Sequence, residues 1–206
     1  MPMRRLFLLM ILALGPSLPA VAQTAKMPAP RFETAIFSGG CFWCMEHDMK
    51  AIPGVTAVMS GYTGGHLLNP TYRDVTGERS GHYEAVRVTY DASRISYSRL
   101  LDRYWPLVDP TDNEGQFCDR GPSYRPAVFV NGPAQRAAAE ASRTKWTKAL
   151  KSGKMATQVI DASRFYEAEA YHRNYSETAS LNYNLYRKSC GRDALLVRVW
   201  GRDPKT

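Results

Sequence analysis

The segment from Arg31 to Gly54 joins three local patterns that favour a fold with helices layered on a sheet. Its first part, RFETAIFS, has the character of a short strand and runs into the Gly39-Gly40 turn. The next part, CFWCMEHDMKAI, has helical character and stops at Pro53-Gly54. A strand that turns directly into a helix buries its apolar side when the helix packs back on the sheet.

Strands and helices continue to mix along the chain, without internal repeats or low-complexity segments. Alternating or apolar runs predict further strands at 54–62, 82–91, 127–131 and 155–161. Helical spacing predicts helices at 96–108, 133–153 and 165–175. This order predicts the α+β class, as a two-layer sandwich in which helices pack on one mixed β-sheet.

Two long loops interrupt this pattern, at 63–81 and at 109–126. Both are dense in tyrosine, aspartate, arginine and glycine. Loops longer than about 12–15 residues are uncommon inside a compact domain and are often functional. We therefore expect binding or catalytic residues in both loops.

Residues 1–22 have the three parts of a secretory signal peptide. A basic start precedes the apolar run Leu6–Gly15, and Ala20-Val21-Ala22 forms a cleavage pattern. The apolar run is shorter than the roughly 20 residues that span a bilayer, although an N-terminal membrane anchor stays as the alternative. We predict cleavage after Ala22, export to the periplasm or the medium without stable membrane association, a linker at 23–31 and a single catalytic domain at 32–206.

The formal net charge of +8 is spread along the chain rather than gathered in one run. Nucleic-acid-binding proteins typically show a basic cluster or a recognised binding fold. The sequence shows neither, so we predict no nucleic-acid partner. Solubility is the simplest interpretation of the basic excess, although a mildly acidic substrate or partner stays possible.

Four cysteines, Cys41, Cys44, Cys118 and Cys190, follow the predicted signal peptide. In an exported protein an even number of cysteines usually forms structural disulfides, and this is the alternative to any redox function. Cys41 begins a predicted helix, where free N–H groups and the helix dipole lower a thiol pKa to about 3.5–7.5. Cys44 lies three residues on, at a spacing that suits a disulfide.

The Cys-x-x-Cys pair alone is compatible with other sites. A zinc site would need a second close pair of ligands, and the sequence offers none, so we predict no metal. A thioredoxin-like oxidoreductase, whose pair also opens a helix after a strand, and a non-catalytic exported binding domain are the competing functions. Phe42 and Trp43 either pack in the core or line a pocket beside the thiol.

The motifs of the chain resemble those of one family. GGCFWCME is similar to the GCFWGxE signature of the A-type peptide methionine sulfoxide reductases, the MsrA family. The resemblance continues in order through SGYTGG, NPTYRDV, GHYEAVRVTYD, the DPT…CDRGPSYRPAVF segment and FYEAEAYHRNY. Cys44 departs from the commonest pattern, which has glycine there, and Cys118 replaces the usual asparagine. The resemblance implies a ferredoxin-like sandwich with long active-site loops.

The resemblance also implies the role of each matching residue. It implies Cys41 as the attacking cysteine, Glu84 as the carboxyl group beside the sulfoxide oxygen, Tyr72 and Tyr124 as donors to that oxygen, Asp119 as a pocket carboxylate, and Phe42 and Trp43 as the aromatics that hold the substrate methyl group. The physical chemistry is compatible with these roles, because a sulfoxide oxygen must be protonated to leave. If Glu84 points inward from its strand, burial raises its pKa and makes it that acid.

The implied reaction reduces the S-epimer of methionine sulfoxide to repair oxidised exported proteins, with peptide-bound sulfoxide as the expected substrate and free methionine sulfoxide as a further candidate. Cys41 becomes a sulfenic acid, a second cysteine forms a disulfide with it, and a thioredoxin-like donor reduces that disulfide without any cofactor. The candidates for the second, resolving cysteine are Cys44, Cys190 and Cys118. The short spacing favours Cys44.

Overall fold

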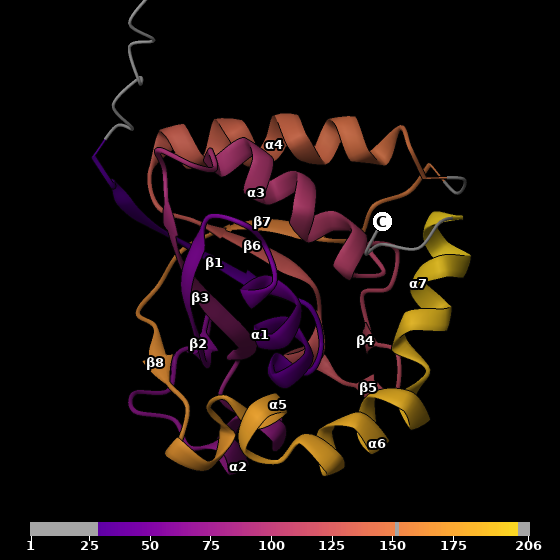
Figure 1. Cartoon of the computed structure of the whole chain (residues 1–206). Coiled ribbons are helices and arrows are strands. Elements are labelled where there is room, and N and C mark those ends of the chain that lie inside the picture. The colour runs from indigo at the N-terminus through magenta and orange to yellow at the C-terminus, as the bar shows by residue number, and fades with distance from the viewer. Residues whose placement is uncertain (1–28, 151–152, 202–206) are drawn as a thin grey trace, which may run out of the picture.

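Six strands form one mixed sheet in the order β7-β6-β1-β3-β2-β8 (Figure 1) in the computed structural model, which describes residues 29–150 and 153–201. β6 and β7 are parallel, and the other neighbouring strands are antiparallel. A separate two-stranded sheet lies in the second long loop. The strands are β1 (Phe32–Ser38), β2 (Val55–Thr63), β3 (Tyr83–Asp91), β4 (Gly115–Gln116), β5 (Asp119–Arg120), β6 (Ala127–Val130), β7 (Gln158–Asp161) and β8 (Tyr166–Glu167).

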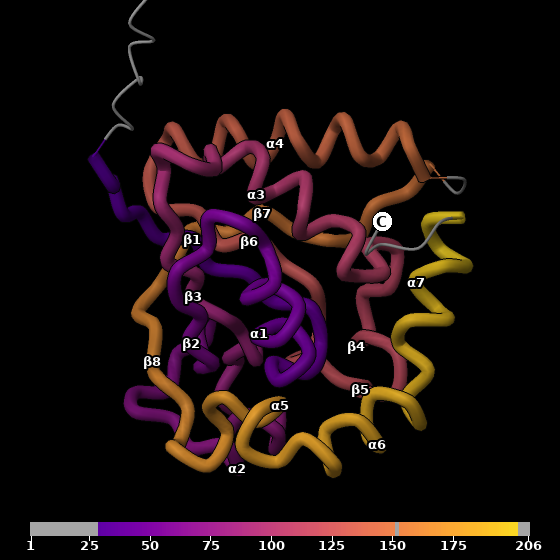
Figure 2. The backbone as a smooth tube through the Cα atoms, in the orientation of Figure 1, coloured from indigo at the N-terminus to yellow at the C-terminus, as the bar shows by residue number. Residues whose placement is uncertain are grey.

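The central strands β6-β1-β3-β2 and the helices α1 and α3 follow the βαββαβ order of a ferredoxin-like fold. The predicted α+β sandwich with a mixed sheet is therefore confirmed. Figure 2 shows the C-terminal helices α5, α6 and α7 running past α1 and then beside β4 and β5. The helices are α1 (Phe42–Lys50), α2 (Tyr72–Thr76), α3 (Tyr97–Tyr104), α4 (Pro133–Thr147), α5 (Tyr175–Thr178), α6 (Ser180–Cys190) and α7 (Arg192–Trp200).

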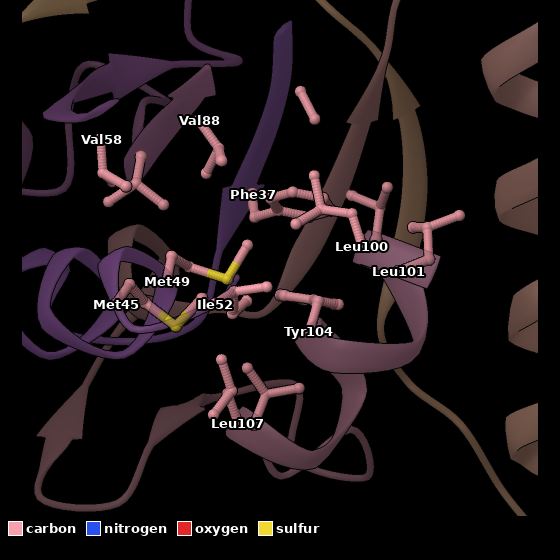
Figure 3. Close-up of a cluster of buried hydrophobic side chains, with 14 of the residues drawn as sticks. Phe37, Met45, Met49, Ile52, Val58, Val88, Leu100, Leu101, Tyr104 and Leu107 are labelled. Carbon is pink, nitrogen blue, oxygen red and sulfur yellow. The ribbon is translucent and has the colours of Figure 1, made fainter. Parts of the chain in front are cut away.

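The main hydrophobic core lies between the sheet and helices α1 and α3 (Figure 3). Met45 and Met49 are one turn apart on α1, so both reach the same buried cluster as Phe37 of β1. The Tyr104 ring of α3 stacks on Phe37 at 4.8 Å between ring centroids. Its hydroxyl donates a 2.8 Å hydrogen bond to the carbonyl of Ser38, the last residue of β1. The core thereby fixes the end of β1 just before the Gly-Gly turn.

The predicted helix at 165–175 is wrong. Tyr166 and Glu167 instead form the edge strand β8, paired with Tyr62 and Gly61 of β2, and a short 3-10 helix follows at Ala170–His172. Gly61 has no Cβ, which leaves room for the carbonyl and the aromatic ring that pack against it. Pairing with a sheet edge thus outweighs the helical spacing, which is a local signal only.

The two long loops contain more structure than the sequence predicted. The first holds α2, whose N-cap Thr71 forms a reciprocal capping box with Asp74. The second holds the β4-β5 pair and a 3-10 helix at Pro122–Tyr124. By contrast, α4 is shorter than the helix predicted at 133–153, because it ends at Thr147. Each loop therefore presents its polar side chains from an ordered element.

The predicted signal peptide at 1–22 lies outside the described residues, as does most of the predicted linker. The predicted domain at 32–206 is described except for residues 151–152 and 202–206. Within the described chain, each helix is too short or too polar to cross a lipid bilayer.

Candidate active site

Cys41 occupies the N-cap of α1, directly after the Gly39-Gly40 turn. Gly40 has a φ of +81°, and a Cβ there would lie 2.7 Å from the Gln116 side chain, so both the conformation and the space require glycine. The Arg192 guanidinium donates a 3.1 Å hydrogen bond to the Gly39 carbonyl. The turn is thus held from both sides, and the Cys41 thiol is buried, with 6% of the residue exposed.

Two carboxyl groups take the first backbone N–H groups of α1. The N–H of Phe42 donates to Glu84 Oε2 at 2.9 Å, and the N–H of Cys41 donates to Asp119. The N–H groups at the positive end of α1 therefore donate hydrogen bonds to these two carboxyl groups and not to the Cys41 sulfur. Burial, the hydrogen bond to Cys44 and the charges of Glu84 and Asp119 raise the pKa of Cys41. The predicted lowering of this pKa is wrong for the resting site.

Glu84 points inward from β3 and is buried, as its role as an acid requires. Burial raises the pKa of Glu84 to about 8, although the hydrogen bond from Phe42 opposes the shift. At neutral pH the Glu84 side chain is therefore largely protonated and able to donate a proton beside Cys41.

The two predicted loop tyrosines meet next to this acid. Tyr72 begins α2 in the first loop, Tyr124 ends the 3-10 helix in the second, and the Tyr124 hydroxyl donates a hydrogen bond to Tyr72. Burial raises the pKa of Tyr72 to about 12 and also raises the pKa of Tyr124, and the nearby Glu84 charge adds to both shifts. Both phenols stay neutral and can donate hydrogen bonds to a bound oxygen.

The aromatic side chains after Cys41 form an apolar wall. The buried Phe42 ring packs beside Tyr72 and His172, at 6.4 and 5.1 Å between centroids. The half-buried Trp43 stacks on Tyr175 at 3.8 Å, and its indole N–H donates to His172 Nδ1 at 3.2 Å. His172 thus supports this wall through its contacts with both aromatic side chains.

The four cysteines divide into a disulfide and a thiol pair. Cys118 and Cys190 form a disulfide, while Cys41 and Cys44 are free thiols, with Cys41 donating a hydrogen bond to the Cys44 sulfur. Both remote candidates for the resolving cysteine are therefore bonded to each other. Within the described residues, the side chains grouped closely enough to hold a metal ion are Cys118, Asp119 and Cys190, and this disulfide already joins the two sulfurs.

Tyr186 of α6 is a site residue that the sequence analysis missed. Its hydroxyl hydrogen-bonds to Asp119 Oδ2 and to the Cys41 sulfur, so it links the pocket carboxylate to the thiol. Tyr186 lies one helical turn before Cys190, which the disulfide ties to Cys118, the neighbour of Asp119. The spacing of Tyr186 and Cys190 was the available sequence signal. It indicates a contact with Asp119 only once the pairing of Cys190 with Cys118 is known.

Replacing Tyr186 by phenylalanine should lower kcat/KM about tenfold, because Asp119 and Cys41 lose a shared donor worth about 1–2 kcal/mol. The measurement is steady-state turnover of a sulfoxide, the substrate that the sequence resemblance implies, with thermal unfolding to show that the fold is kept. Tyr97→Phe is the matched control, since its buried hydroxyl has no hydrogen-bond partner within the described residues. An unchanged kcat/KM for Tyr186→Phe would show that the Tyr186 hydroxyl has no part in the function of the site.

Comparisons with known proteins agree with this geometry. The model of the family described as "Peptide methionine sulfoxide reductase" matches residues 33–204. Peptide methionine sulfoxide reductase MsrA 2 of Caulobacter vibrioides is 63% identical over 202 residues, which cover 97% of this chain and 100% of the relative.

Two solved structures resemble the fold. Mxr1 of Saccharomyces cerevisiae in reduced form is 25% identical, with a TM-score of 0.69 and coverage of 77% of this chain and 91% of that one. Methionine sulfoxide reductase A of Corynebacterium diphtheriae is 29% identical, with a TM-score of 0.65 and coverage of 73% and 76%.

Proposed function

Because the chain belongs to the peptide methionine sulfoxide reductase family, and is therefore an oxidoreductase, we propose that it reduces the S-epimer of methionine sulfoxide through thiol chemistry at Cys41. The observation that carries this proposal is the convergence of groups at the start of α1. A buried thiol lies beside a protonated carboxyl group, Glu84, and the neutral phenols Tyr72 and Tyr124 lie near the same carboxyl group. This is the set that a sulfoxide needs, since its oxygen must gain a proton as its sulfur is attacked.

In the first step the Cys41 sulfur attacks the sulfoxide sulfur while Glu84 gives its proton to the oxygen. Tyr72 and Tyr124 stabilise the charge that develops on that oxygen. Phe42 and Trp43 hold the methyl group, and the Asp119 carboxylate orients the substrate. The S–O bond of the substrate breaks as an S–O bond to Cys41 forms, so that methionine leaves and Cys41 becomes a sulfenic acid. The proton lost by the Cys41 thiol returns Glu84 to its protonated form.

In the second step Cys44 condenses with the sulfenic acid to form a disulfide, and water leaves. Cys44 is favoured because it is free and hydrogen-bonded to Cys41, whereas Cys118 and Cys190 are paired with each other. An external thioredoxin-like dithiol then reduces the Cys41–Cys44 disulfide by exchange. These steps call for no metal or organic cofactor.

We place this activity outside the cytoplasm, where it repairs oxidised exported proteins after removal of residues 1–22. The signal-peptide pattern of the sequence supports this placement. The N-terminus of the protein isolated from a periplasmic fraction should begin at Gln23. Recovery of an uncleaved chain in the membrane fraction would contradict the proposal.

An epimer-resolved assay tests the proposed reaction. A peptide with methionine S-sulfoxide should be reduced and its R-sulfoxide left intact, since one enzyme serves one epimer. Free methionine sulfoxide serves as a second substrate in the same assay. Equal rates for both epimers would contradict the proposal.

The resolving cysteine is identified by a thiol count and peptide mapping after one turnover without reductant. We expect one disulfide between Cys41 and Cys44, and the Cys118–Cys190 disulfide unchanged. A new disulfide between Cys41 and Cys190 would overturn the assignment of Cys44.

A further inference from the structure

Two arginines and one aspartate form a buried ionic cluster behind the thiol pair, which we call the Arg–Asp–Arg cluster (Arg187, Asp48 and Arg192). Arg187 Nη1 lies 2.9 Å from Asp48 Oδ1, and Arg192 Nε lies 3.8 Å from Asp48 Oδ2. Their side chains are 8%, 4% and 1% exposed, in the order Arg187, Asp48, Arg192. Buried charges of this kind are costly unless they are neutralised, so the cluster calls for an explanation.

The Arg–Asp–Arg cluster is placed against Cys44. Asp48 follows Cys44 by one turn on the same face of α1. Cys44 packs against Tyr183 of α6, whose hydroxyl accepts a 2.9 Å hydrogen bond from Arg187 Nη1. Arg187 lies one turn after Tyr183, so Cys44 faces the part of α6 that carries the guanidinium.

The Arg–Asp–Arg cluster leaves Arg192 without an anionic hydrogen-bond partner among the described residues. Arg187 forms close ion pairs with both Asp48 and Asp193, at 2.9 and 2.6 Å, whereas Arg192 Nε lies 3.8 Å from the Asp48 carboxylate. The other nitrogens of Arg192 donate only to neutral acceptors, namely the Gly39 and Leu107 carbonyls and the Met45 sulfur. Arg192 Nε and Asp48 Oδ2 have no hydrogen-bond partner among the described residues.

The environment of Cys41 has the opposite sign. Cys41 faces the carboxyl groups of Glu84 and Asp119, and its thiol donates to the Cys44 sulfur. The hydrogen bond from Cys41 and the charges of Arg192 and Arg187 lower the pKa of Cys44, against the effects of burial and Asp48. The titratable and charged groups that face Cys44 are Cys41 and Asp48 of α1, Glu84 of β3, Tyr183 and Arg187 of α6, and Arg192 of α7.

We propose that the Arg–Asp–Arg cluster holds Cys44 as the thiolate of the Cys41–Cys44 pair and thereby makes Cys44 the nucleophile that resolves oxidised Cys41. The resolving role rests on the proposed function. In this step the Cys44 sulfur attacks the Cys41 sulfenic sulfur, an S–S bond forms and the S–O bond breaks. The Cys44 sulfur is oxidised as the Cys41 sulfur is reduced, and the leaving hydroxide takes a proton from solvent and departs as water. Arg187 and Arg192 are positioning residues, since they act through Cys44.

Thiolate titration tests the proposal without turnover. In a Cys41→Ser background with the Cys118–Cys190 disulfide intact, Cys44 is the one thiol that titrates, and ultraviolet thiolate absorbance follows it. Adding Arg187→Gln should raise the midpoint by about one pH unit, since a guanidinium near the thiolate is lost. Adding Asp48→Asn should lower it by a similar amount, and Arg187→Lys should keep it close to the background value.

The opposite signs separate the proposal from simple destabilisation, which would move both variants in one direction. Arg87→Gln is the matched control, because Arg87 pairs with Glu167 at the surface of β3 and β8. If Arg187→Gln does not fold, Asp48→Asn decides alone through its downward shift. Unmoved midpoints, or shifts of the same sign, would overturn the proposal.

Rapid-quench kinetics on the chain with Cys41 intact then test the consequence. With a methionine sulfoxide peptide and no reductant, Arg187→Gln should form the Cys41–Cys44 disulfide about tenfold more slowly at neutral pH, and raising the pH should restore the rate. Methionine release is recorded in the same experiment, so the attacking and resolving steps are read separately. If mapping shows another disulfide, the resolver assignment fails, whereas the titration still decides whether the cluster sets the charge of Cys44.

Discussion

Replacing Cys41 by serine should abolish sulfoxide reduction, with a fall in kcat of about four orders of magnitude or more. The serine hydroxyl is not ionised near neutral pH, and it does not accept an oxygen atom as a thiol does. Serine keeps the size of the side chain at the N-cap of α1, so the fold should be retained. The measurement is methionine release from a sulfoxide peptide in a single turnover, where the wild type releases one equivalent.

Cys44→Ser is the matched control, because it changes the same kind of side chain one turn along α1. We expect it to release close to one equivalent of methionine and then to stop, since Cys41 stays oxidised. This contrast separates attack from resolution. Normal turnover by Cys41→Ser would show that the mechanism proposed for Cys41 is wrong.

Replacing Glu84 by glutamine should lower kcat by about 10²–10⁴-fold, because the amide keeps the shape but has no proton to donate. In the wild type, activity should fall as pH rises through about 8, since Glu84 then loses its proton. The glutamine variant should lack this alkaline limb. A pH profile of kcat/KM for both proteins is the measurement, and the same limb in the variant would assign it to another group.

The same substitution should stabilise the fold at high pH. The pKa of Glu84 in the folded chain, about 8, lies above its ordinary value of 4.5, so its contribution is complete below 4.5 and is lost as pH rises toward 8. Over this window the wild type should lose about 1.4 kcal/mol per pH unit relative to Glu84→Gln. Denaturant unfolding between pH 5 and about 8 measures the difference.

Glu167→Gln is the control for both experiments, because Glu167 is an exposed residue of β8 that pairs with Arg87. Glu167→Gln should leave the pH profile of kcat/KM unchanged. It should change the free energy of unfolding by no more than about 0.5 kcal/mol. A Glu84→Gln variant that is less stable than wild type at about pH 8 would contradict the burial of a protonated carboxyl group.

Most of the candidate site could be named from the sequence because its residues lie within contiguous motifs. Cys41, Phe42 and Trp43 come from one turn of chain, and Tyr72, Glu84, Asp119 and Tyr124 come from segments that match the family in order. Tyr186 could not be named this way, since its contact with Asp119 depends on the packing of α6 against β5. The prediction of a helix at 165–175 was wrong for a similar reason, since it also depended on tertiary structure. The edge strand β8 forms only because β2 is there to pair with it.

By itself, the sequence determined the family and the order of the central strands and helices, and it predicted Cys41 as the reactive thiol. These follow from short-range patterns, namely hydrophobic spacing, turn residues and contiguous motifs. Only the tertiary structure decided the pairing of Cys118 with Cys190 and the burial of Glu84. It also decided the direction of the Cys41 pKa, because helix position predicts a lower value while burial and two distant carboxyl groups raise it. Charges and solvent act through space, so their balance at a thiol depends on residues that the sequence does not place together.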